Sequence, residues 1–215
     1  MQNSKQQDAR QNAKAGAEPG GSGEKRSRGR WKLVALLAIC AAPIIASYLT
    51  YYVIKPEGRT NYGELLDPRN YPMPNLKLST LDGQPASLQD YQGKWIMLQP
   101  EASACPESCQ TKLYNMRQLR LTQGKEMERV ERVWLILDQE PLDTLVIREY
   151  DGTRMLRADP KELQQWLPVA PDATLADHLY VIDPLGNLMM RYPKNADPNK
   201  IKRDLGKLLR ASSIG

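Results

Sequence analysis

Two cysteines at the junction of a strand and a helix constrain this chain more than any other feature. The apolar run Trp95–Leu98 predicts a buried strand, and apolar residues at helical spacing predict a helix from residue 110 to about 122. Cys105 and Cys109 lie between these segments, in the stretch Ala-Cys-Pro-Glu-Ser-Cys. The pattern therefore predicts two thiols where a strand ends and a helix begins.

The chemistry of this stretch follows from its spacing and from Pro106. Proline suits the first helical position, because its missing N–H would have no intrahelical partner there. Free N–H groups and the positive end of the helix dipole favour a thiolate over a thiol. If the helix includes both cysteines, their Cα atoms lie roughly 6 Å apart, which permits a disulfide. Two thiolates on one face can also hold a soft metal ion. The alternative to both functions is that the two cysteines are buried and only pack in the core.

An apolar segment near the N-terminus predicts a membrane anchor. Leu33–Ile54 is apolar or weakly polar throughout, about the ~20 residues that span a bilayer, and we place the transmembrane helix at residues 31–54. A cleaved signal peptide and a lipoprotein processed at Cys40 are the alternatives. The length of the apolar run and the bulky Ile39 before that cysteine favour an anchor. Basic residues dominate the preceding flank: Arg26, Arg28, Arg30 and Lys32.

These basic residues predict orientation and location. By the positive-inside rule the N-terminus lies in the cytoplasm and everything after the helix is exported. The formal net charge is +5, and a basic cluster beside an apolar segment is explained by membrane topology, so we expect no nucleic-acid partner. We expect a disordered cytoplasmic tail at residues 1–30, a linker at 55–74 and a folded domain at 75–215. Three cysteines do not make a disulfide framework, so that domain depends on a hydrophobic core.

Further apolar runs predict an α/β domain. Val133–Leu137 is continuously apolar, which is typical of a central strand covered on both faces. Leu179–Ile182 and Leu188–Tyr192 predict an antiparallel pair joined by a turn, and a final helix begins at Pro198. Other expected elements are strands at residues 76–78, 86–88 and 155–156, the last at a sheet edge, and helices at 141–150 and 160–167. Strands alternating with helices predict a mixed sheet with helices on both faces.

The order of these motifs resembles the thioredoxin superfamily. The turn Leu81-Asp82-Gly83, the stretch Tyr91–Trp95, the buried strand and the Cys-Pro-Glu-Ser-Cys motif follow one another as in those proteins. Within the superfamily, residues 105–109 and the helix after them resemble the Sco/SenC family of copper chaperones, over roughly residues 75–210. Proteins of that family are membrane-anchored and assist assembly of the binuclear copper site of cytochrome c oxidase. The implied fold is a thioredoxin-like domain preceded by one transmembrane helix.

The resemblance also implies a ligand set and a client. In the family, the two cysteines and a histidine from an Asp-His pair hold copper, which maps here onto Cys105, Cys109 and His178, the only histidine of the chain. Thiolates select Cu(I), and a neutral imidazole completes a trigonal site. The implied client is the copper-site subunit of cytochrome c oxidase. The implied location is a bacterial inner membrane, with the domain in the periplasm.

Two other functions compete with copper delivery. In a thiol–disulfide oxidoreductase for exported proteins, Cys105 would attack and Cys109 would resolve the mixed disulfide. A non-catalytic thioredoxin-like interaction module would have kept the fold alone. The position of the His178 ring relative to the two sulfurs separates the copper hypothesis from the others.

Overall fold

The computed structural model describes residues 24–54 and 61–214, which belong to two units. The first unit contains helix α1 (Glu24–Leu49) and a π-helical turn, Thr50–Ile54. Its segment Arg30–Tyr52 is long and apolar enough to cross a membrane. The expected tail falls mostly on residues 1–23, outside the described residues, and α1 begins within its last part.

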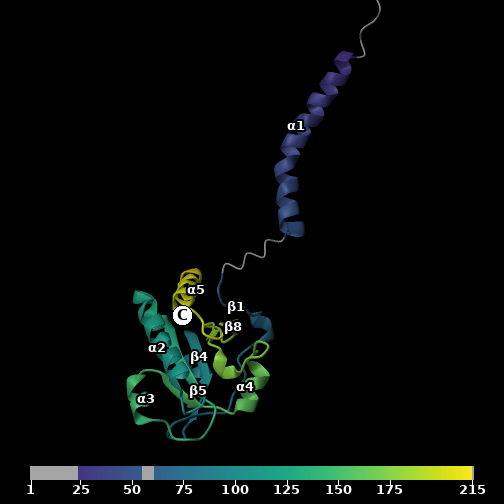
Figure 1. Ribbon diagram of the computed structural model, residues 1–215. Helices are drawn as coiled ribbons and strands as arrows, with labels where there is room; N and C mark the ends of the chain where they lie inside the picture. The colour runs from purple at the N-terminus through teal and green to yellow at the C-terminus, as the bar shows by residue number, and fades with distance from the viewer. Residues whose placement is uncertain (1–23, 55–60, 215) are drawn as a thin grey trace, which may run out of the picture. The chain divides into compact units, whose positions relative to one another are not determined.

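The second unit is built on one eight-stranded mixed sheet (Figure 1). Strands β4, β5 and β6 run parallel, and the other neighbouring strands pair antiparallel. In spatial order the strands are β1 (Glu64–Leu65), β8 (Leu188–Arg191), β7 (Tyr180–Ile182), β4 (Trp95–Glu101), β5 (Val130–Ile136), β6 (Arg154–Arg157), β2 (Leu78–Thr80) and β3 (Pro85–Ala86).

The two most apolar runs form the centre of the sheet, as their composition predicts. All seven residues of β5 and the first six of β4 are buried. The strands pair in register, with Leu98 opposite Val133, and Leu98 also lies opposite Tyr180 of β7. A strand flanked on both edges and covered on both faces has no solvent-exposed side, which explains the lack of alternation in its sequence.

Helices cover both faces of this sheet (Figure 1). Apolar residues of α2, α3 and α5 pack with one set of strand residues, and those of α4 pack with the other set. The helices are α2 (Glu107–Leu121), α3 (Thr144–Glu149), α4 (Pro160–Trp166) and α5 (Pro198–Ala211). Short 3-10 segments occupy Pro68–Asn70, Leu88–Tyr91, Gly124–Arg129 and Leu175–Asp177. The expected mixed sheet with helices on both faces is confirmed.

Aspartate caps and prolines set two of the helix starts. Asp159 precedes α4 and Asp197 precedes α5, and each carboxylate accepts a hydrogen bond from a backbone N–H of the first turn. Each is followed by proline at the first helical position, where no N–H is needed. These local signals explain why both starts could be located from the sequence.

One strand lies in a different place from the one expected. The strand at residues 155–156 was predicted at a sheet edge, but β6 lies between β5 and β2. The hairpin of β2 and β3 adds to its outer side, with Ser79 opposite Arg157. This pairing joins segments far apart in the chain, so local sequence carries no sign of it.

The folded unit also begins earlier than residue 75. Part of the linker expected at 55–74 contains β1, in which Glu64 pairs with Arg191 of β8. The buried carboxylate of Asp204, on α5, accepts hydrogen bonds from the N–H groups of Tyr62 and Gly63, at 2.8 and 2.9 Å. A Cβ at Gly63 would lie 2.6 Å from the sulfur of Met190, so this close approach requires glycine.

Candidate functional site

The two cysteines lie on either side of the N-terminus of α2 and are joined in a disulfide. Cys105 belongs to the loop after β4, and Cys109 belongs to the first turn of α2. Their Cα atoms are 5.1 Å apart. The helix therefore includes only one of them, because Pro106 is the N-cap residue and the first helical residue is Glu107.

The backbone at Cys105 adopts an uncommon conformation. Its φ is +32°, in a region that residues with a side chain rarely adopt. Two hydrogen bonds support this conformation, one within the loop and one from α2. The Cys105 N–H donates to the Ala102 carbonyl at 3.1 Å, and the Gln110 side chain donates to the Cys105 carbonyl at 3.2 Å. Such strained residues persist where surrounding structure holds them, and they concentrate at functional sites.

Both sulfurs belong to the hydrophobic core. Cys105 and Cys109 are each 0% exposed and pack with the apolar residues of α2. Their chain neighbours Ala104 and Ser108 are exposed, as is Pro106. The disulfide is therefore shielded by a short loop and one helical turn, and a reacting partner reaches it only when this segment moves.

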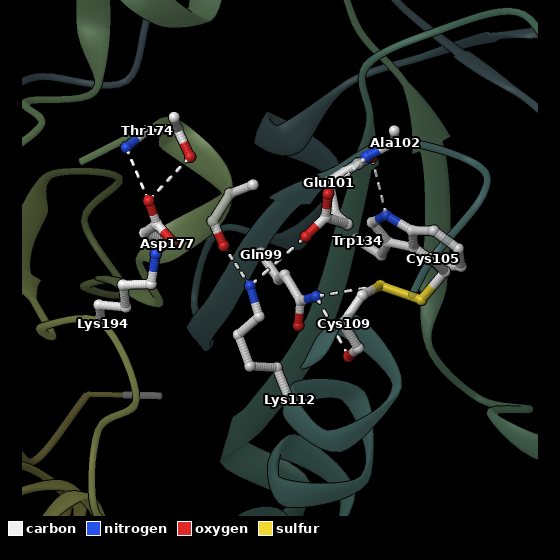
Figure 2. Close-up of polar contacts among 11 residues, drawn as sticks. Gln99, Glu101, Ala102, Cys105, Cys109, Lys112, Trp134, Thr174, Asp177 and Lys194 are labelled. Atoms are coloured by element: carbon white, nitrogen blue, oxygen red, sulfur yellow. Dashed lines mark hydrogen bonds and ion pairs between the residues drawn. A yellow bond between two sulfur atoms is a disulfide. The ribbon is translucent and has the colours of Figure 1, made fainter. Parts of the chain in front are cut away.

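A buried amide contacts the disulfide from β4 (Figure 2). Gln99 is 0% exposed, and its Nε2 group donates to Cys109 twice, to the sulfur and to the carbonyl oxygen, each at 3.4 Å. Its Oε1 atom has no hydrogen-bond partner among the described residues. Sequence reasoning missed Gln99, although it is the first polar residue in the buried run that begins at Trp95.

A cavity of about 900 Å³ adjoins the cysteine-bearing turn. One wall is formed by Pro106 and Ser108, together with later residues of α2. Ala176, Asp177 and Leu179, before β7, and residues 193–196, after β8, form the opposite walls. The cavity can therefore receive part of a partner next to the disulfide, although neither cysteine lines it.

An ion pair ties α2 to β4 beside this cavity (Figure 2). Lys112 Nζ lies 3.5 Å from Glu101 Oε2, and it also donates to the carbonyl of Ala176. Burial lowers the pKa of Lys112, although the Glu101 carboxylate opposes that shift. The lysine therefore links helix, strand and the loop before β7.

A second ion pair holds the same loop from the other side. Asp177 Oδ1 lies 2.8 Å from Lys194 Nζ, and Oδ2 accepts hydrogen bonds from the N–H and hydroxyl groups of Thr174. Lys194 and the Thr174 N–H lower the pKa of Asp177 to about 2. Figure 2 shows Asp177 between Thr174 and Lys194, and its carboxylate therefore joins the two ends of this loop region through polar contacts.

His178, the third residue of the predicted site, faces away from the cysteines. Its ring packs edge-on against Tyr180, which belongs to the core cluster on the opposite side of the sheet. Nδ1 lies 2.8 Å from the Tyr192 carbonyl, to which it donates, and Nε2 accepts from the Ala170 N–H at 3.2 Å. Both nitrogens are thus occupied by backbone groups, and burial lowers the pKa of His178.

The predicted set of three copper ligands is therefore not assembled. Within residues 24–54 and 61–214, no three His, Cys, Asp or Glu side chains form a group that could hold a metal ion. Cys105 and Cys109 are brought together, whereas His178 has no free lone pair to offer. Of the three predicted ligands, only the sulfurs of Cys105 and Cys109 lie together.

Two protein-family models match the chain. The model described as "Transmembrane-like, thioredoxin-like, C-terminal domain" matches residues 95–212, and the model described as "Transmembrane-like, N-terminal domain" matches residues 23–53. The first covers more than half of the chain. The search of curated proteins found no match to this chain.

Solved structures share the fold at low identity. Yeast Sco1 with copper bound has a TM-score of 0.50 and 16% identity, covering 66% of this chain and 90% of that chain. BsSco, described as a member of the Sco family of cytochrome c oxidase assembly proteins with a disulfide switch, has a TM-score of 0.50 and 17% identity, covering 68% and 98%. The thioredoxin domain of a thiol-disulfide oxidoreductase from Bacteroides vulgatus has a TM-score of 0.49 and 15% identity, covering 65% and 96%.

Proposed function

The chain belongs to the family described as transmembrane-like, thioredoxin-like, C-terminal domain, and from this premise we propose that it is a membrane-anchored thiol–disulfide exchange protein. One observation carries the proposal: Cys105 and Cys109 form a disulfide at the start of α2, beside a cavity that can receive a partner. Disulfides that take part in exchange are found at such helix starts because the local field stabilises thiolate.

The exchange proceeds by two sulfur-to-sulfur transfers. A thiolate of a partner dithiol attacks the Cys105 sulfur, a mixed disulfide forms, and Cys109 leaves as thiolate and takes up a proton. The partner's second thiolate then displaces Cys105, which is protonated in turn. The partner loses two electrons and becomes a disulfide, and the pair gains them. In the reverse direction, Cys105 attacks a partner disulfide and Cys109 resolves the intermediate.

In this proposal, the membrane topology determines the compartment in which the exchange takes place. The helical segment Arg30–Tyr52 spans a bacterial inner membrane, with the basic flank in the cytoplasm and the domain in the periplasm. Partners are then the thiols of exported proteins. The cysteines of the copper-site subunit of cytochrome c oxidase are the client we propose, supported by the description of BsSco as belonging to a family of oxidase assembly proteins.

Cu(I) binding by the reduced pair is a second candidate function. The observation in its favour is the proximity of two sulfurs inside an apolar shell, since thiolates in such surroundings select Cu(I). Yeast Sco1, which shares the fold, was solved with copper bound. Because His178 is held by backbone groups, the pair would bind copper without an imidazole ligand.

Thiol counting on the full chain in detergent tests both functions. Cys40 is the one free cysteine of the described residues, so reduction with dithiothreitol should raise the count from one to three. The variants Cys105→Ser and Cys109→Ser should each give two thiols under either condition. If mild reductant leaves the parent at one thiol, exchange is excluded. Competition with a Cu(I) chelator then shows whether the reduced parent, and neither serine variant, retains copper.

A further inference from the structure

Gln99 is the one side chain that donates a hydrogen bond to the disulfide from inside the core, among the residues that the structure describes. We propose that Gln99 is a positioning residue that favours the reduced form of the Cys105–Cys109 pair. The inference rests on the proposed exchange function and deepens it, because it states which redox form the core of the domain stabilises.

The position of Gln99 on β4 directs its amide at the disulfide. Met97 and Trp95, two and four residues earlier on the same face, belong to the core cluster that contains both cysteines. Gln99 is completely buried on that strand, so its amide cannot turn to water. The 3.4 Å contact with the Cys109 carbonyl keeps the amide directed at Cys109.

In the disulfide form, the hydrogen-bonding groups of the Gln99 amide are poorly paired. A disulfide sulfur has no proton to donate and is a weak acceptor, so the 3.4 Å contact between Nε2 and the Cys109 sulfur is a weak bond. Gln99 Oε1 is buried with no partner among the described residues. A buried carbonyl oxygen without a hydrogen bond is costly, since it has left water without compensation.

Reduction of the disulfide supplies a hydrogen-bond partner for the Gln99 amide. Two electrons from a dithiol and two protons convert the disulfide into two thiols, while the dithiol becomes a disulfide. The new Cys109 S–H can donate to Gln99 Oε1. If Cys109 is a thiolate instead, it accepts from Nε2 more strongly than a neutral sulfur does. In either protonation state, the reduced form therefore gains hydrogen bonding that the oxidised form does not have.

The redox midpoint of the full chain in detergent tests this role. Parent and Gln99→Met are equilibrated with graded ratios of reduced and oxidised dithiothreitol, and the two forms are counted by alkylation and mass spectrometry. Methionine has a similar shape but cannot replace the amide. One hydrogen bond corresponds to a roughly 3- to 10-fold smaller equilibrium constant for reduction in the variant, and a tenfold change is about 30 mV.

A matched control separates this effect from a general change in packing. Leu98→Met alters the neighbouring, equally buried residue on the other face of β4, and its midpoint should equal that of the parent. Gln99→Leu removes the amide in the same way as methionine and should lower the equilibrium constant for reduction by the same roughly 3- to 10-fold. This variant also carries the test if Gln99→Met does not fold.

The outcomes distinguish this inference from the function on which it rests. An equal midpoint in parent and Gln99→Met, with both folded by near-ultraviolet circular dichroism, overturns the role of Gln99 and leaves exchange intact. An unchanged midpoint in a folded Gln99→Leu overturns it as well. A parent disulfide that does not exchange with dithiothreitol at any ratio overturns the proposed function, and the inference with it.

Discussion

His178 and Leu179 are neighbours in the chain, but they lie on opposite faces of the sheet. Leu179 packs in the core cluster that contains Cys105 and Cys109, whereas the His178 ring packs against Tyr180 in the other cluster. The extended backbone that leads into β7 alternates its side chains between faces as a strand does, so only one of two consecutive residues can point toward the cysteines. Here that residue is the leucine, and the imidazole has a structural role.

The first prediction concerns the stability that His178 provides. His178→Ala removes two hydrogen bonds and leaves the Ala170 N–H and the Tyr192 carbonyl without their partner. We expect the free energy of unfolding to fall by about 2–4 kcal/mol, with the redox midpoint of the cysteine pair unchanged. Urea denaturation checks the first value. The exposed Lys161→Ala variant is the control, with an expected change below about 0.5 kcal/mol. A shifted midpoint would contradict this role.

The second prediction is a stability change with pH near neutrality. Burial lowers the pKa of His178 below its ordinary 6.5, so in the window below that value the unfolded chain binds a proton that the native protein does not. Stability therefore falls as the pH drops from about 6.5 toward the native pKa. Denaturation at pH 7.5 and pH 5.5 measures the difference. The difference should shrink in His178→Gln, and an equal slope in that variant would assign it to other groups.

The third prediction concerns a lower pH range. Lys194 and the Thr174 N–H lower the pKa of Asp177 from 3.8 to about 2, so the native state binds this proton less readily than the unfolded chain. Its contribution is present above pH 4 and is lost as the pH falls toward 2. Asp177→Asn should flatten the stability profile over that interval. A profile as steep in Asp177→Asn as in the parent would exclude Asp177 as the cause.

The fourth prediction concerns the Lys112–Glu101 pair. Lys112→Met leaves a mostly buried carboxylate and the Ala176 carbonyl without their cation, and should cost about 1–3 kcal/mol of unfolding free energy. Adding Glu101→Gln should recover part of this loss, because the unpaired charge is then gone. The double-mutant cycle measures the coupling. Strictly additive effects would mean that the two side chains do not interact in solution.

Local patterns were enough to predict the centre of the fold. Trp95–Leu98 and Val133–Leu137 are continuously apolar, and both belong to the innermost strands. The final helix was located by Pro198 and by the apolar residues spaced along its buried face. In each case the signal lies within one element, because burial on both faces or on one stripe is recorded in its own composition.

Features that depend on distant pairing could not be predicted in the same way. The two residues of β1 are too few to give a pattern, and β6 is interior only because β2 pairs with it. The alternation from His178 to Ile182 does define two faces. Which face meets the cysteines depends on how β7 pairs with β4, and that is tertiary information.

Asp204 determines which elements of the folded unit would bear a force applied at its N-terminal end. Its carboxylate holds the N–H groups of Tyr62 and Gly63, 142 and 141 residues earlier in the chain, and β1 follows at once. A pull on the chain at Tyr62 would therefore load α5 and β8 first, through Asp204 and through the pairing of β1 with β8. The segment from β4 to α2, which carries the disulfide, makes none of these hydrogen bonds itself.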